Sequence, residues 1–343
     1  MPPQPTILSG ALLMIGLPGP ELDDSTRELI RAAGVNNFIL FRRNVVAPEQ
    51  LRTLCHDLAA ACREHTGVEA LIAIDQEGGS VTRLPPPWRQ FPDQRLLAES
   101  ADPVGALTDY AAACAAELRE CGINFNFAPV LDVAPSAAGY FMARRSLGEN
   151  PETVARLGAL VIREMQRGGV AACGKHFPGL GSARLDPHQV GFAIAKDHAQ
   201  LTAEDLPPFR GAITAGVAAL MTSHTVYPGL DAERPATLSP RILTDLLREE
   251  LGYDGLVVTD DLEMGAIETA MSVAEAARLA LVAGADLLLI CKEHAKVRET
   301  LSGLDRARED GTVTEGRVCK AVGRIERVRK NFPSGKNLVG AVA

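Results

Sequence analysis

Short apolar segments alternate with longer amphipathic segments along almost the whole chain. The apolar segments are rich in Val, Ile, Leu and Phe, and their hydrophobicity is continuous rather than alternating. Continuous runs of this kind are typical of parallel strands that are buried on both faces. The pattern therefore predicts eight buried strands, at residues 9–17, 37–41, 70–75, 123–129, 170–176, 218–224, 255–260 and 285–290.

Segments with helical spacing separate and follow these strands, near residues 22–33, 47–65, 103–121, 152–168, 206–215, 240–251, 272–283, 295–306 and 314–330. Asn150 and Ser239 each stand before a proline, as helix N-caps do, and Gly252 is placed to end a helix. Eight strands that are each followed by a helix predict an α/β fold of the (β/α)8 barrel type. A doubly wound open sheet is the alternative, but no GxGxxG motif follows the first strand and there is no P-loop.

The length of 343 residues suits one such barrel with few additions. We expect residues 1–330 to form a single catalytic domain and residues 331–343 to form a C-terminal tail. Two stretches, 85–102 and 178–192, are expected to be long functional loops.

Composition and charge limit the partners, metal sites and cell compartment that we expect for this protein. The net charge is −8 and no basic stripe is present, so neither nucleic acid nor an anionic membrane surface is an expected partner. The seven cysteines include no CxxC pair, which argues against a metal site and favours a reducing compartment. The N-terminus lacks a positively charged region and no apolar run reaches about 18 residues. We expect a cytoplasmic monomer that uses no metal or cofactor.

Polar and charged residues stand where the predicted strands end. Asp75 ends the third strand, Lys175 and His176 end the fifth, His224 ends the sixth and Asp260 ends the seventh. A (β/α)8 barrel carries its active site at this edge. The chain has no HExxH and no GxSxG motif. What remains at the strand ends is a set of carboxylates and histidines, with arginines and a lysine that could bind hydroxyl groups. These residue types suit the cleavage of glycosides.

Several sequence blocks make this prediction specific: FILFRRN at 38–44, IDQEGGSVTRL at 74–84, NFNFAPVLDV at 124–133, RSLG at 145–148, KHFPG at 175–179, PATLS at 235–239 and LGYDGLVVTDDLEM at 251–264. Together and in this order they resemble glycoside hydrolase family 3, over about residues 13–325. They are most similar to its bacterial β-N-acetylglucosaminidase (β-hexosaminidase) branch, which works in cytoplasmic peptidoglycan recycling.

The resemblance implies the catalytic residues. Asp260 would be the nucleophile that forms a covalent glycosyl-enzyme, so that the anomeric configuration is retained. His188 would be the general acid/base, with Asp186 orienting its ring. Asp261 is expected to cap a helix.

The same resemblance implies that the sugar is bound by Asp75, Arg83, Arg145, Lys175 and His176. His224 is placed with them, either lining the site or supporting it. Glu77 and Asp132 are expected to be structural.

The sequence departs from the family within the loop that carries the histidine. The usual KHFPGHGDTxxDSH reads KHFPGLGSARLDPH, with Leu180, Ser182, Ala183 and Pro187 at altered positions. Ser80 stands where arginine is common. The loop therefore keeps the Asp186–His188 pair but has lost polar partners.

The leading hypothesis is a retaining exo-β-N-acetylglucosaminidase acting on GlcNAc–1,6-anhydro-MurNAc fragments. A β-N-acetylglucosaminide phosphorylase and a β-glucosidase or β-xylosidase of the same family are the enzymatic alternatives. A sugar-binding protein without catalytic activity is the alternative from another class.

Overall fold

Eight parallel strands form one continuous sheet. The computed structural model describes residues 8–137, 139–184 and 193–334. The strands follow the order β10-β1-β2-β3-β4-β5-β6-β9. Their bounds are β1 Leu13–Gly16, β2 Asn37–Leu40, β3 Leu71–Ile74, β4 Phe125–Asn126, β5 Ala171–Phe177, β6 Ala219–Thr222, β9 Leu256–Val258 and β10 Leu288–Ile290. Each of the eight predicted strands is present.

The sheet closes on itself between β9 and β10. Val258 forms a parallel bridge with Leu287, and the Thr259 amide donates to the Leu287 carbonyl at 3.0 Å. Since β10 also pairs with β1, the first and last strands of the ring are neighbours. The prediction of a (β/α)8 barrel is confirmed, and the open sheet is excluded.

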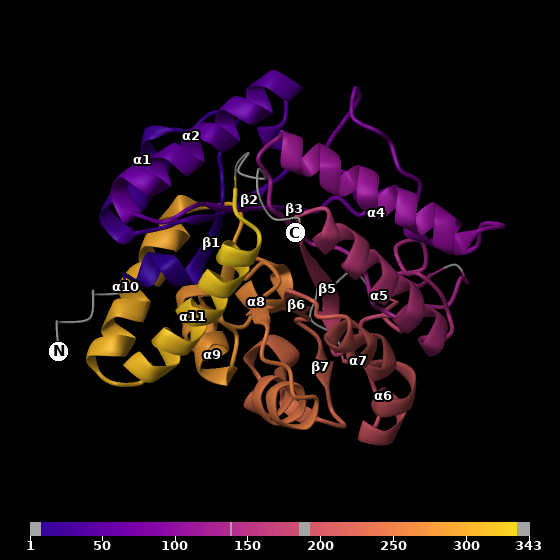
Figure 1. The fold of residues 1–343 in the computed structure, drawn as a ribbon. Coiled ribbons are helices and arrows are strands. Elements are labelled where there is room, and N and C mark those ends of the chain that lie inside the picture. Colours follow the sequence, from indigo (N-terminus) through magenta and orange to yellow (C-terminus); the bar gives the residue numbers. More distant parts are fainter. Residues whose placement is uncertain (1–7, 138, 185–192, 335–343) are drawn as a thin grey trace, which may run out of the picture.

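Helices surround the strands on the outside (Figure 1). They are α1 Asp24–Ala33, α2 Pro48–Thr66, α4 Pro103–Glu120, α5 Pro151–Arg167, α7 Leu206–Thr214, η4 Arg241–Glu250, α9 Val273–Ala283 and α10 His294–Glu309. The predicted caps act as expected, because Asn150 Oδ1 accepts from the Thr153 amide and Ser239 Oγ accepts from the Ile242 amide. Within the described ranges, no helix combines the length and apolar character that crossing a bilayer requires.

The apolar core has two layers. The inner layer fills the barrel with side chains from the strands, such as Met14, Phe125, Met221 and Leu289, and the outer layer lies between strands and helices. The last helix, α11 (Glu315–Asn331), contributes Ile325 and Val328 to the inner layer. It therefore covers the amino-terminal end of the barrel and leaves the carboxyl-terminal end for the site (Figure 1).

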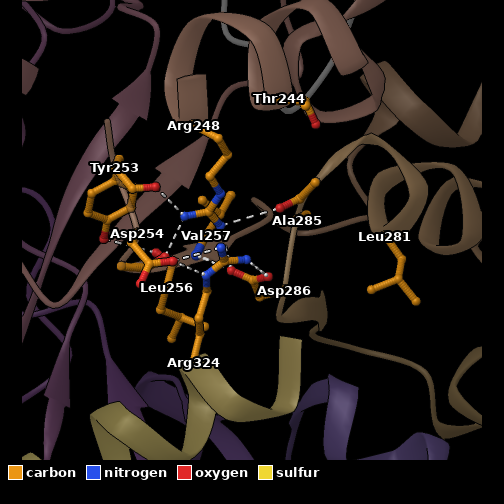
Figure 2. A network of polar contacts seen from close by, with 12 residues as sticks. Thr244, Arg248, Tyr253, Asp254, Leu256, Val257, Leu281, Ala285, Asp286 and Arg324 are labelled. Atoms are coloured by element: carbon orange, nitrogen blue, oxygen red, sulfur yellow. Dashed lines mark hydrogen bonds and ion pairs between the residues drawn. The ribbon is translucent and has the colours of Figure 1, made fainter. Parts of the chain in front are cut away.

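A buried carboxylate joins α11 to the closure of the ring. Asp286, just before β10, accepts hydrogen bonds from Arg248 of η4 at 2.6 Å and from Arg317 and Arg324 of α11 at 2.9 and 3.2 Å. It also accepts from the Val257 amide at 3.0 Å. Figure 2 shows Asp286 beside Arg248 and Arg324. One side chain thus links η4, β9, β10 and α11.

The structure adds elements that the hydrophobic pattern did not predict. Residues 9–12, predicted as strand, form the 3-10 turn η1 (Ser9–Leu12). Short elements interrupt the connections: α3 Gln94–Ala98, α6 His198–Glu204, β7 Val226–Tyr227, β8 Asp231–Pro235, α8 Gly265–Glu268, η2 Arg42–Asn44 and η3 Ala236–Leu238. Of the predicted tail, residues 335–343 lie outside the described residues.

Candidate active site

A cavity of about 280 Å³ opens at the carboxyl-terminal end of the barrel. Its walls include six of the predicted site residues: Asp75, Arg83, Arg145, Lys175, His176 and Asp260. A larger cavity of about 410 Å³ lies at the opposite end, beside Leu256 and Arg324. Barrel enzymes carry out their chemistry at the carboxyl ends of the strands, so the smaller cavity is the candidate site.

A network of opposite charges forms the deep wall of this cavity. Lys175 Nζ contacts Asp75 Oδ1 and Glu77 Oε1, each at 2.7 Å. Arg145 binds Glu77 with two hydrogen bonds, from Nε at 2.9 Å and from Nη2 at 2.7 Å. Arg83 Nη2 lies 3.5 Å from Asp75 Oδ2, whereas Lys175 contacts the other oxygen of the same carboxylate. Paired groups of this kind hold fixed positions, so the wall offers a preorganised set of hydrogen-bond partners.

The protonation states of these groups follow from their neighbours. Burial raises the pKa of Glu77, but the charges of Arg145 and Lys175 outweigh it and hold that pKa below its ordinary value. Burial lowers the pKa of Lys175, and the carboxylates of Asp75 and Glu77 more than reverse this effect. Both groups therefore stay charged at neutral pH, which a network built on charge pairing requires.

His176 is held by a carboxylate behind it. Its Nδ1 donates to Asp132 Oδ2 at 2.7 Å, and its backbone amide donates to Asp132 Oδ1 at 3.2 Å. Asp132 is fully buried, and it is not one of the described residues that line the cavity. Glu77, the buried member of the charge network, likewise does not itself line the cavity. The contacts of Asp132 with His176, and those of Glu77 with Lys175 and Arg145, fit the structural roles expected for these two carboxylates.

Asp260 follows β9 and lines the cavity with its neighbour Asp261. Its Oδ1 accepts a hydrogen bond from the Asp261 amide at 2.8 Å. Asp261 Oδ1 accepts from the Glu263 amide at 3.0 Å, which makes a local turn rather than the expected helix cap. Burial raises the pKa of Asp261 to about 6, and the charges of Glu263 and Asp260 add to this effect.

His224 is not among the described residues that line the cavity. Its Nδ1 lies 2.7 Å from Thr237 Oγ1, and its Nε2 donates to the Asp261 carbonyl at 2.9 Å. Of the two roles expected for His224, these contacts fit support of the Asp260–Asp261 segment.

Asp186 and His188 lie outside the described residues, in the segment 185–192. The part of that loop before them is packed into the protein. Leu180 is buried in the outer core and its amide donates to Asp132 Oδ1 at 2.6 Å. Ala183 is also buried, and its carbonyl accepts from the Phe141 amide. At positions 180 and 183 this chain therefore has buried apolar side chains, Leu180 and Ala183, where the family has polar ones.

The cavity also includes residues that the sequence did not single out. Phe41 follows β2, and Cys291 and Lys292 follow β10. The position after a barrel strand was an available signal, but a phenylalanine or a cysteine there does not by itself indicate chemistry. Over the described part of the chain, no group of three or more His, Cys, Asp or Glu side chains is arranged to hold a metal ion.

Comparison with known proteins agrees with this geometry. Residues 9–328 match the glycosyl hydrolase family 3 N terminal domain. The chain belongs to glycosyl hydrolase family 3. One relative, the β-hexosaminidase of Thiobacillus denitrificans, is 37% identical over 300 residues, which cover 85% of this chain and 81% of the relative.

Solved structures of similar enzymes share the fold. A β-N-acetylglucosaminidase from Paenibacillus sp. str. FPU-7 superimposes with a TM-score of 0.92 at 37% identity and covers 99% of this chain, which spans 65% of that longer protein. A β-N-acetylhexosaminidase from Beutenbergia cavernae gives a TM-score of 0.87 at 32% identity, with 94% of this chain and 97% of that chain covered. Together with the family match, these neighbours confirm the resemblance to glycoside hydrolase family 3 that was stated from the sequence.

Proposed function

We propose that this family 3 glycoside hydrolase is a retaining exo-β-N-acetylglucosaminidase, which removes GlcNAc from the non-reducing end of GlcNAc–1,6-anhydro-MurNAc fragments. The observation that carries the proposal is the cavity in which Asp260 shares a wall with the buried Asp75–Lys175–Arg145 network. The names of the relatives support the sugar specificity. We further propose that it acts as a cytoplasmic monomer, and its seven free cysteines support a reducing compartment.

Sugar binding uses the deep wall. Asp75 accepts hydrogen bonds from hydroxyl groups, while Lys175, Arg83 and Arg145 donate to hydroxyl and acetamido oxygens. His176 presents its Nε2 to the cavity side because Asp132 holds Nδ1. Since these donors and acceptors are already fixed by their partners, little ordering is needed when the sugar binds.

The chemistry takes place in two steps at the anomeric carbon. Asp260 attacks, the glycosidic C–O bond breaks, and His188 gives its proton to the leaving oxygen. Water then attacks the glycosyl-enzyme, His188 takes a proton from the water, and Asp260 leaves. Asp186 orients the imidazole and stabilises its protonated form. Two inversions return the original configuration.

His188→Ala is expected to slow the enzyme according to the leaving group. With alkyl β-GlcNAc substrates, whose leaving oxygens need a proton, kcat/KM should fall about 10²–10⁴-fold, the usual contribution of general acid catalysis. With dinitrophenyl β-GlcNAc, whose leaving group departs unprotonated, the first step should change little. Steady-state kinetics across a series of aryl and alkyl leaving groups measures this difference. An equal loss across the series would contradict a general-acid role.

Product analysis in phosphate buffer separates hydrolysis from phosphorolysis. A neutral imidazole repels phosphate less than a carboxylate would, so a histidine acid/base admits both reactions in principle. We expect free GlcNAc as the main product, with and without phosphate, in a chromatographic assay of aryl β-GlcNAc cleavage. Dominant GlcNAc-1-phosphate would overturn hydrolysis in favour of the phosphorylase. Faster cleavage of aryl β-glucoside than of aryl β-GlcNAc would indicate a β-glucosidase instead.

A further inference from the structure

The turn that carries Asp260 is held mainly by backbone amides. The Asp261 amide donates to Asp260 Oδ1 and the Glu263 amide donates to Asp261 Oδ1. The Leu262 amide donates to the Leu289 carbonyl of β10 at 3.0 Å. These bonds give the turn its internal shape and attach its middle to the neighbouring strand.

Glu263 attaches the end of the same turn to the segment after β10. Its side chain is fully buried. One oxygen accepts from the Lys292 amide at 2.5 Å and the other accepts from the Glu293 amide at 3.1 Å, while Lys296 Nζ lies 3.6 Å away. A buried carboxylate is costly unless hydrogen bonds and an opposite charge satisfy it. Glu263 meets this condition only while the two segments stay together.

The two segments that Glu263 joins are both walls of the cavity. Asp260 and Asp261 belong to the first, and Cys291 and Lys292 belong to the second. On the other side of the turn, His224 Nε2 binds the Asp261 carbonyl. The turn is therefore fixed between β6 on one side and the β10 segment on the other, with Glu263 as the side-chain link to the latter.

We propose that Glu263 is a positioning residue for Asp260. It touches neither substrate nor reacting atoms, but sets the distance between the Asp260 carboxylate and the anomeric carbon. This inference rests on the nucleophilic role proposed for Asp260. The reacting atoms must come within about 3–3.5 Å, and a displacement of about 1 Å can cost about 10²-fold in rate.

Glu263→Gln tests the proposal with little change in size. The new amide group faces a backbone N–H, so one hydrogen bond is lost and two donors are brought together. We expect kcat for aryl β-GlcNAc to fall about 10²-fold, irrespective of the leaving group. The inhibition constant of GlcNAc should stay near the wild-type value, because Asp75, Arg145 and Lys175 are held by their own network. A purely structural role would weaken both quantities together.

Glu268→Gln is the matched control. Glu268 also pairs with Lys296, at 2.5 Å, but it is partly exposed, and among the described residues its side chain accepts no hydrogen bond from the backbone amides that follow β10. Its kcat should remain near wild type. Should Glu263→Gln not fold, Glu263→Asp keeps the charge but shortens the reach, and it should show the same selective loss of kcat. A wild-type kcat in either folded Glu263 variant, or an equal loss in Glu268→Gln, would overturn the inference. Full activity of Asp260→Asn would instead overturn the proposed mechanism itself.

Discussion

Asp260→Asn is expected to lower kcat/KM for aryl β-GlcNAc by roughly 10⁴-fold or more, the scale seen when a catalytic nucleophile is removed. The asparagine has the same shape but carries no negative charge, so it can neither attack the anomeric carbon nor stabilise its developing positive charge. The Asp261 amide can still donate to the remaining side-chain oxygen, so the turn should keep its fold. Steady-state kinetics, with the melting temperature as a check on folding, measures the effect.

Asp261→Asn is the natural comparison, since the two carboxylates are adjacent and line the same cavity. Its oxygen can still accept from the Glu263 amide, so this variant should lose far less activity. If the two variants were equally impaired, or if Asp261→Asn were the worse, the nucleophile would have to be reassigned.

The second large effect is on stability, at the other end of the barrel. Asp286→Asn should lower the free energy of unfolding by about 3–5 kcal/mol, because it leaves the charges of Arg248, Arg317 and Arg324 without their buried counter-ion. The melting temperature should fall by roughly 4–7 °C, because the unfolding entropy of a chain of this length is about 0.7 kcal/mol/K. At temperatures where the variant is folded, kcat should be close to wild type, since the active site lies at the opposite end.

Asp254→Asn controls for the loss of a charge in the same region. Asp254 pairs with Arg324 and Arg327 but is 66% exposed, so its loss should cost only about 0–1 kcal/mol. Thermal unfolding of both variants in the same buffer makes the comparison. A fall of less than 2 °C for Asp286→Asn, on the order expected for a surface pair, would contradict the role of Asp286.

The hydrophobic pattern was sufficient for the barrel because each strand is buried on both faces and therefore reads as a continuous apolar run. Even β4, which pairs over only Phe125–Asn126, lies within its predicted segment. The short elements that interrupt the connections between barrel strands were missed, such as α8 and the β7–β8 hairpin. Their few residues show no periodicity, and tertiary contacts such as Ser239 Oγ to Asp231 Oδ2 define them.

The candidate site was predictable to the extent that its residues end strands. Asp75, Lys175, His176 and Asp260 were found in this way, and all four line one cavity. Glu263 and Asp286 were not, because their roles depend on which backbone amides and arginines reach them from other elements. The sequence shows that a residue is charged, but it does not show that the residue is buried and shared between two segments.

The closure of the ring between β9 and β10 has a consequence for how the protein acquires activity during synthesis. The deep wall of the cavity uses residues from β3 to β5, which leave the ribosome early. The turn that carries Asp260 is attached to β10, and β10 pairs with β1, nearly the whole length of the chain away. Contacts so distant in sequence form late. A nascent chain would therefore contain most of the charged side chains of this wall well before it could break a glycosidic bond, so the onset of catalytic activity would mark the closure of the ring.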